Sequence, residues 1–109
     1  MKKIIVIALS LIIGCWLAIA AAADGAWSIS GTIPSAPQHL SFSTSGSSLT
    51  GTVDGVAITN GKAEPNTIWF SATRGGVTYN YKGTIVGTKL SLFEEPPSGQ
   101  GRLLTYLHN

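Results

Sequence analysis

One set of side chains in this sequence has the chemistry of a sugar-binding platform. Trp69 and Lys82 are predicted to face each other across a hairpin. Polar side chains should share their face: Ser71, Asn80, Thr73 and Thr78. An exposed aromatic ring beside hydrogen-bonding groups can stack on a sugar ring and bind its hydroxyls. In the alternative interpretation, Lys82 lies over the Trp69 ring as a cation–π pair and only shields it from water.

A second set of side chains has the chemistry of a small apolar ligand cavity. Its five aromatic members are Trp27, Phe42, Phe70, Tyr79 and Tyr81. Ligand pockets are mostly apolar with a few polar anchors, and the two tyrosine hydroxyls would supply those anchors. The alternative is a filled core whose tyrosine hydroxyls reach the mouth of a barrel.

No catalytic or metal-binding pattern is found in the chain. His39 and His108 are the only imidazoles, and neither has cysteines or carboxylates at the spacing of zinc ligands. The serines include no G-x-S-x-G motif. Glu94 and Glu95 stand before two prolines and are predicted to form a solvated turn instead of an acid–base pair. The sequence therefore predicts a protein that is not an enzyme and has no metal or cofactor.

The first 23 residues have the three parts of a secretory signal. Two lysines precede an apolar run over residues 4–17, and a tract of small residues ends at Ala23. We expect cleavage after Ala23, which leaves residues 24–109 as a single domain. Two alternatives stay open: lipidation at Cys15, which follows a lipobox-like segment, and an uncleaved membrane anchor.

Removal of residues 1–23 leaves a neutral chain. Five basic residues then balance five acidic ones, and Cys15 is lost, so an exported domain has no disulfide. A neutral surface without a basic stripe argues against nucleic acid as a partner. It also argues against a membrane partner, unless the chain is lipidated at Cys15. The predicted location is secreted or periplasmic.

The spacing of apolar residues in the 24–109 segment predicts an all-β domain. Apolar and polar residues alternate in short runs separated by glycine, proline and serine, which is typical of half-buried strands. We predict strands at residues 27–33, 38–44, 49–53, 56–59, 67–74, 77–85, 88–93 and 102–107, with loops at 60–66 and 94–101. About eight strands in an up-and-down meander can close into a small barrel. An open or sandwich-like sheet is the alternative.

Two dipeptides predict hairpin turns and fix the pairing of their strands. Asp54-Gly55 suits a type I′ turn, which places Val53 opposite Val56, Gly51 opposite Ile58, and Thr50 opposite Thr59. Gly75-Gly76 likewise places Phe70 opposite Tyr81, Ala72 opposite Tyr79, Ile68 opposite Gly83, Trp69 opposite Lys82, Ser71 opposite Asn80, and Thr73 opposite Thr78. The apolar members of these pairs all fall on one face.

A repeated segment predicts a third hairpin. The residues around Gly51, Val53 and Gly55 recur 32 positions later around Gly83, Ile85 and Gly87. By this analogy Val86-Gly87 forms the turn, and Tyr81 opposes Leu92 while Gly83 opposes Leu90. Glycines 51 and 83 stand inside strands, so we expect them at bends or bulges of a curved sheet.

Several short motifs resemble a known set of proteins. Gly25-x-Trp27, Leu49-x-Gly51-Thr52-Val53-x-Gly55, Asn66-x-Ile68-x-Phe70 and Tyr81-x-Gly83-Thr84-Ile85-x-Gly87 are similar to those of an uncharacterised family of small exported bacterial β-domains. The resemblance implies a fold and a compartment and carries no chemistry. A fainter similarity to avidin-type barrels lies in the segment from Gly46 to Thr52. It implies a barrel, and the biotin-site residues of avidins have no counterparts here.

The expected function is that of an exported, non-enzymatic binding module. Its partner would be a small molecule, a glycan or a protein. One alternative is an inhibitor of a secreted hydrolase, which would act through the loop at residues 94–101. The other is a structural envelope protein anchored by lipid at Cys15.

Overall fold

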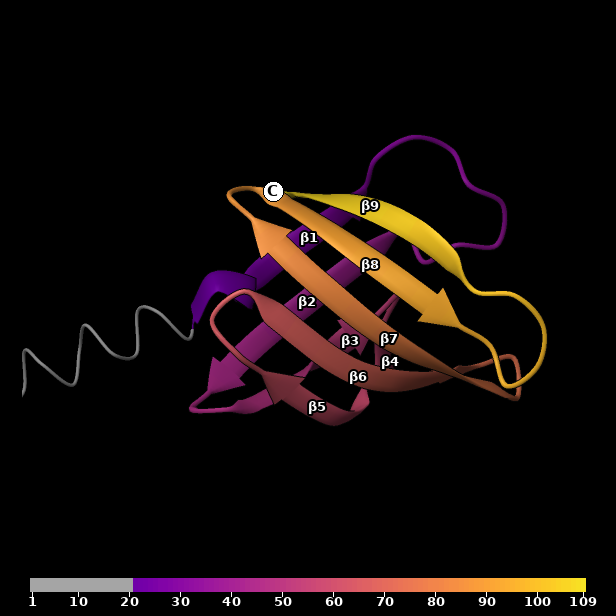
Figure 1. Cartoon of the computed structure of the whole chain (residues 1–109), viewed down its shortest axis with the longest axis horizontal. Helices are drawn as coiled ribbons and strands as arrows, with labels where there is room; N and C mark the ends of the chain where they lie inside the picture. The colour runs from indigo at the N-terminus through magenta and orange to yellow at the C-terminus, as the bar shows by residue number, and fades with distance from the viewer. Residues whose placement is uncertain (1–20) are drawn as a thin grey trace, which may run out of the picture.

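Nine antiparallel β-strands follow one another within residues 21–109 (Figure 1). The computed structural model describes residues 21–109, so the predicted signal peptide up to residue 20, with Cys15, lies outside the described residues. A 3-10 turn, η1 (Ala21–Ala23), precedes the strands. The strands are β1 (Gly25–Ile29), β2 (His39–Ser45), β3 (Ser48–Val53), β4 (Val56–Ala57), β5 (Thr59–Ala63), β6 (Thr67–Arg74), β7 (Val77–Val86), β8 (Lys89–Glu95) and β9 (Arg102–His108). Within residues 21–109, no helix is long and apolar enough to cross a membrane.

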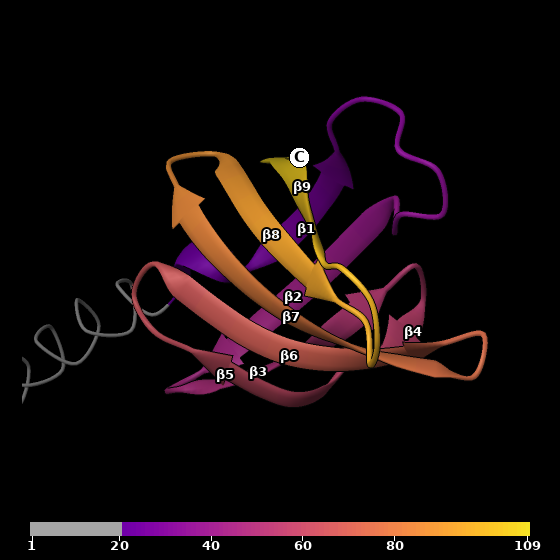
Figure 2. The same cartoon turned by 45° about the vertical axis from the view of Figure 1, so that its right-hand side comes forward.

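The strands close into a barrel. Strands adjacent in sequence pair with each other, except that β5 pairs with β3 instead of β4. Because β1 also pairs with β9, eight strands form a ring, and β4 is a short addition beside β3 (Figures 1 and 2). Closure leaves no long unpaired edge that could recruit another chain. The predicted all-β meander of eight strands and its closure are confirmed.

The two hairpins predicted from Asp-Gly and Gly-Gly are confirmed. Asp54 and Gly55 have φ of 48° and 84°, and Gly75 and Gly76 have φ of 60° and 80°, as a type I′ turn requires. Val53 opposes Val56, and all six pairs predicted between β6 and β7 are present. The faces of these strands are therefore set by their turns.

The predicted third hairpin is wrong by two residues in its pairing. The turn lies at Gly87-Thr88, so Val86 opposes Lys89, Gly83 opposes Leu92, and Tyr81 opposes Glu94. Val86 is β-branched and resists positive φ, whereas Gly87 adopts φ of 62° at the first turn position. A shift of two residues keeps every side chain on the same face. The faces were thus correct although the partners were not.

Other predicted boundaries need correction. Residues 60–66 are not a continuous loop, because β5 continues through Ala63 and pairs with β3 at Ser48 and Lys62. Thr50 therefore does not oppose Thr59. Asn60 has φ of 54°, which gives the chain the extra residue of a bulge. The first strand ends at Ile29 instead of residue 33, and β8 extends through Glu95, so the loop expected at 94–101 starts at residue 96.

The barrel interior is filled by large side chains. The most deeply buried residues include Trp27, Leu40, Val53, Ile68, Leu90, Leu92, Leu104 and Tyr106. Glycine is required where two backbones approach: a Cβ on Gly51 would collide with the carbonyl of Ser41. Gly83 has a different reason, since a Cβ there would lie 2.7 Å from Leu90 Cδ1 and 3.0 Å from Ile68 Cγ1. Gly51 thus stands where two backbones come close, whereas Gly83 makes room for core side chains.

Candidate functional site

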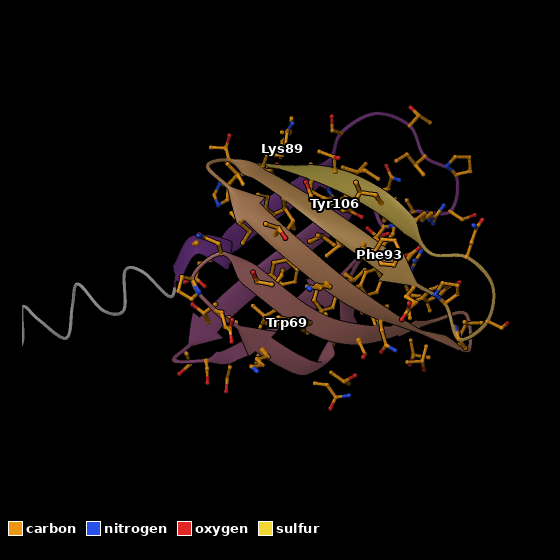
Figure 3. The ribbon with its side chains drawn as sticks, viewed as in Figure 1. Trp69, Lys89, Phe93 and Tyr106 are labelled. Carbon is orange, nitrogen blue, oxygen red and sulfur yellow. The ribbon has the colours of Figure 1, made fainter. Side chains whose placement is uncertain are left out.

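A row of five side chains crosses the outer face of the barrel from β5 to β9. The pairing registers place them directly opposite one another in the order Lys62, Trp69, Lys82, Phe93 and Leu103. Adjacent strands lie about 4.8 Å apart, so Trp69 and Phe93 are separated by about 10 Å. Lys82 stands between the two rings, which Figure 3 labels on the outer side of the ribbon.

A shallow depression of about 260 Å³ lies along this row. It is lined by Trp69, Asn80, Lys82, Phe93, Glu95 and Tyr81, the last of which has a side chain that belongs to the interior. Of the residues predicted for the two candidate sites, Trp69, Asn80, Lys82 and Tyr81 therefore line this depression. Tyr79 is not among the lining residues. Phe93 and Glu95 join the site. Glu95 was missed because residues 94–101 were assigned to a loop, and the two-residue error in the third hairpin separated Phe93 from its partner Lys82.

The lysine over the tryptophan ring is Lys62 instead of Lys82. Lys62 Nζ lies 5.3 Å from the centroid of the Trp69 ring. The predicted cation–π pair was based on the opposite neighbour of Trp69, on β7, because β5 had been assigned to a loop. Lys82 is exposed and, among the residues that the structure describes, forms no salt bridge. Its ammonium group is thus available to a ligand.

Asn80 is oriented by a contact with the neighbouring strand. The Ser71 hydroxyl donates a hydrogen bond of 2.6 Å to Asn80 Oδ1, and Ser71 is 8% exposed. Thr73 and Thr78 bond to each other through their hydroxyls at 2.8 Å. Because Oδ1 is occupied by Ser71, the amide NH₂ of Asn80 is left as a donor at the depression. Glu95, directly opposite Asn80 on β8, adds an acceptor.

Phe93 is held in place although it is exposed. Its side chain is 42% exposed, and a Cβ on Gly101 would collide with the edge of its ring. The ring therefore lies against the backbone of residue 101, where only glycine leaves room. This contact fixes the second aromatic wall of the depression.

The predicted ligand cavity is occupied by stacked rings. Phe70 and Tyr81 stack with centroids 4.8 Å apart, and Phe42 lies 5.3 Å from Phe70. Tyr79 lies 6.4 Å from Tyr81, and Trp27 instead contacts His108 edge-on at 4.8 Å. The aromatic residues thus form the packed core of the second interpretation, with Tyr106 also inside the barrel in Figure 3.

Glu94 lies inside the barrel, which corrects its prediction as part of a solvated turn. It is 3% exposed and accepts hydrogen bonds from Tyr81 Oη at 2.6 Å, Arg74 Nη1 at 3.1 Å and Arg102 Nε at 2.7 Å. Burial, together with the hydrogen bond to Glu94, raises the pKa of the Tyr81 phenol well above its ordinary value of 10.0. Tyr81 therefore remains a donor over the physiological pH range.

The two histidines lie on the surface and do not share a site. His39 Nδ1 lies 3.5 Å from the Ser28 hydroxyl, and His108 Nε2 lies 2.9 Å from the Asp24 carbonyl oxygen. Within residues 21–109, no group of three potential metal-ligating side chains is found. Comparison with protein-family models, curated proteins and solved structures found no match to this chain.

Proposed function

We propose that this protein is an exported, non-enzymatic β-barrel module that binds a saccharide on its outer face. The observation that carries this proposal is the depression between the Trp69 and Phe93 rings, with Lys82 between them. Export is proposed from the signal-like residues 1–23. The filled interior favours an external site over an internal one.

The spacing and polarity of the site suit a short stretch of sugar chain. Two aromatic walls about 10 Å apart offer stacking surfaces at the two ends of a disaccharide unit. Asn80 and Lys82 supply hydrogen-bond donors and Glu95 supplies an acceptor. A sugar hydroxyl can therefore find a partner whether it donates or accepts. The single cation and single carboxylate of the lining cancel, which favours a neutral saccharide over an acidic one.

Isothermal titration of the purified protein with neutral oligosaccharides tests the proposal. The probes are hexasaccharides of β-1,4-linked glucose, xylose and N-acetylglucosamine, and of α-1,4-linked glucose. We expect saturable binding of at least one of them, and its loss in Trp69→Ala and in Phe93→Ala. Leu107→Ala is the matched control, because Leu107 is 46% exposed and does not line the depression. Absence of binding to all four probes, or equal binding by all variants, would contradict the proposal.

Inhibition of a secreted hydrolase is a second candidate, which one observation favours. The loop at residues 96–101 is exposed for most of its length and is anchored by Arg102, whose Nε bonds to buried Glu94. A rigid base pre-organises a protruding loop for insertion into a cleft. Capture of a hydrolase from extracellular extract by the wild type, and its loss when residues 97–100 are replaced by glycine and serine, would favour this function over the first.

A further inference from the structure

A polar cluster at one end of the barrel has a role that the outer face does not explain. The loop at residues 30–38, the Gly75-Gly76 turn and the loop at 96–101 gather at this end (Figures 1 and 2). Arg74 and Arg102 connect them: Arg74 Nη2 donates to the Ser35 carbonyl at 2.8 Å, and Arg102 Nη1 donates to the Pro34 carbonyl at 2.8 Å. The two guanidinium groups therefore hold residues 34 and 35 across the mouth.

The charges of this cluster do not balance. Among residues 21–109, Glu94 is the only acidic side chain within 4.0 Å of either guanidinium. One carboxylate thus serves two permanent cations, and two neutral backbone carbonyls take the positions left over. A carboxylate or phosphate forms stronger hydrogen bonds with a guanidinium than a neutral carbonyl does. Arg74 and Arg102 remain 21% and 37% exposed, so such an anion can reach them.

The loop is built in two parts that differ in how firmly they are held. The fixed part is Ala36 to His39, where Ala36 and Pro37 are buried and the Tyr106 hydroxyl donates to the Pro37 carbonyl at 2.8 Å. The Asp54 carboxylate accepts the backbone N–H groups of Gln38 and His39 at 3.0 and 2.8 Å. None of these contacts involves Arg74 or Arg102.

The remaining part, residues 31–35, has the features of a flap. Gly31 has φ of 87° with open space around it, and Ser35 has φ of 59°, a strained value for a side-chain-bearing residue. Ser35 stands at the third position of a turn closed by the Ala36 N–H and the Ile33 carbonyl, where glycine is preferred. The closed position therefore stores strain at Ser35, whereas Gly31 adopts its positive φ without strain and can serve as a hinge.

We propose that Arg74 and Arg102 form a binding site for a small carboxylate or phosphate anion, which residues 31–35 cover as a flap. The anion takes the place of the Pro34 and Ser35 carbonyls on the two guanidinium groups, and Glu94 keeps its bonds to both arginines. The flap turns about Gly31 and Ser35, and its opening releases the strain at Ser35. This site lies at the barrel mouth and does not depend on the saccharide site.

Hydrogen exchange of the purified protein tests the proposal at constant ionic strength. Sodium phosphate, sodium succinate and sodium chloride are compared over a concentration series. We expect the Ala36 amide, whose hydrogen bond to the Ile33 carbonyl closes the turn of the flap, to exchange faster with saturable dependence on phosphate or on succinate, and not on chloride. Amides of Gln38 and His39 should keep their protection. Whichever anion saturates at the lower concentration identifies the class of ligand, and equal exchange in all three salts would overturn the proposal.

Variants separate the site from a general salt effect. Arg102→Gln should abolish the response to anions, whereas Lys89→Gln, which removes an exposed cation on the outer surface, should leave it intact. Gly31→Ala touches neither arginine and raises the cost of the closed flap, so it should increase the apparent affinity about fivefold. Unchanged affinity in Gly31→Ala would overturn the flap even if Arg102→Gln does not fold.

Discussion

Phe93 and Glu94 are neighbours in β8, and each lies on the side of the barrel where hydropathy alone would not place it. The aromatic residue faces solvent at 42% exposure, and the carboxylate is 3% exposed inside. Three hydrogen-bond donors surround Glu94, so both of its carboxylate oxygens have partners although the side chain is buried. Phe93 has no comparable set of partners outside.

This contrast separates structural from functional use of an unusual position. The buried Glu94 carboxylate accepts hydrogen bonds from Tyr81, Arg74 and Arg102, and these bonds connect β6, β7, β8 and β9. Phe93 keeps an aromatic surface exposed beside Lys82, where a ligand can cover it. We therefore expect inner substitutions to change stability and outer ones to change binding.

Glu94→Gln should give the largest effect on stability. Removal of the charge leaves two guanidinium groups at the mouth without their counterion, and loss of one partner of a buried ion pair costs about 3–5 kcal/mol. The free energy of unfolding in urea measures this loss. Glu95→Gln, one residue further and exposed, is the matched control and should stay within about 0.5 kcal/mol of the wild type. Similar losses in both variants would remove the contrast.

Gly83→Ala tests the inner face at a position without charge. The added methyl group would lie 2.7 Å from Leu90 Cδ1, and overpacking of a filled core costs about 1–3 kcal/mol. Urea unfolding should show this loss. Thr84→Ala, on the outer side of the same strand, should cost less than about 1 kcal/mol. A stable Gly83→Ala variant would show that the core has spare volume.

Alkaline pH should lower the free energy of unfolding through the buried tyrosines of the inner face. Burial raises the pKa values of the Tyr81 and Tyr106 phenols above 10.0, so the unfolded chain releases these protons first. The two phenols contribute fully to the free energy of unfolding below pH 10, and this contribution is lost as the pH rises further. The free energy of unfolding then falls by up to about 1.4 kcal/mol per pH unit for each phenol. Urea unfolding in a pH series measures the slope. Tyr81→Phe should reduce it, and an unchanged slope would show that Tyr81 does not contribute.

Phe93→Ala should have the smallest effect on folding. The half-exposed ring contributes about 1 kcal/mol or less to the free energy of unfolding, because much of its surface stays in water in the folded state. The same variant should lose saccharide binding, as measured by isothermal titration. A loss of stability as large as that of Glu94→Gln would place Phe93 among the structural residues.

The sequence predicted strand pairing best where only one pair of residues could adopt the backbone conformation of a tight turn. Gly75-Gly76 determined every pair between β6 and β7, because a two-residue loop leaves no freedom of register. Between β7 and β8, the repeated motif favoured Val86-Gly87, and the conformational preference of valine decided for Gly87-Thr88. Local stereochemistry was thus a better guide than the internal repeat.

The candidate site was only partly predictable from the sequence. Trp69, Asn80 and Lys82 followed from one hairpin, whereas Glu95 required the correct end of β8 and Phe93 the correct register between β7 and β8. The alternation of Leu90, Leu92 and Glu94 was a signal that residue 94 points inward, but two following prolines suggested a turn. The partners of Glu94 come from β6, β7 and β9, and contacts between four strands do not appear in any local pattern.

The pairing of β1 with β9 brings the first and last described strands side by side. The Asn109 backbone N–H donates a hydrogen bond of 2.9 Å to the Ala26 carbonyl, so two residues that are far apart in the sequence are in direct contact. A short linker between residues 109 and 24 would allow circular permutation, with new ends in the turn at Gly46-Ser47. For the same reason the barrel is suited to insertion into a surface loop of another protein, where it would widen the loop very little.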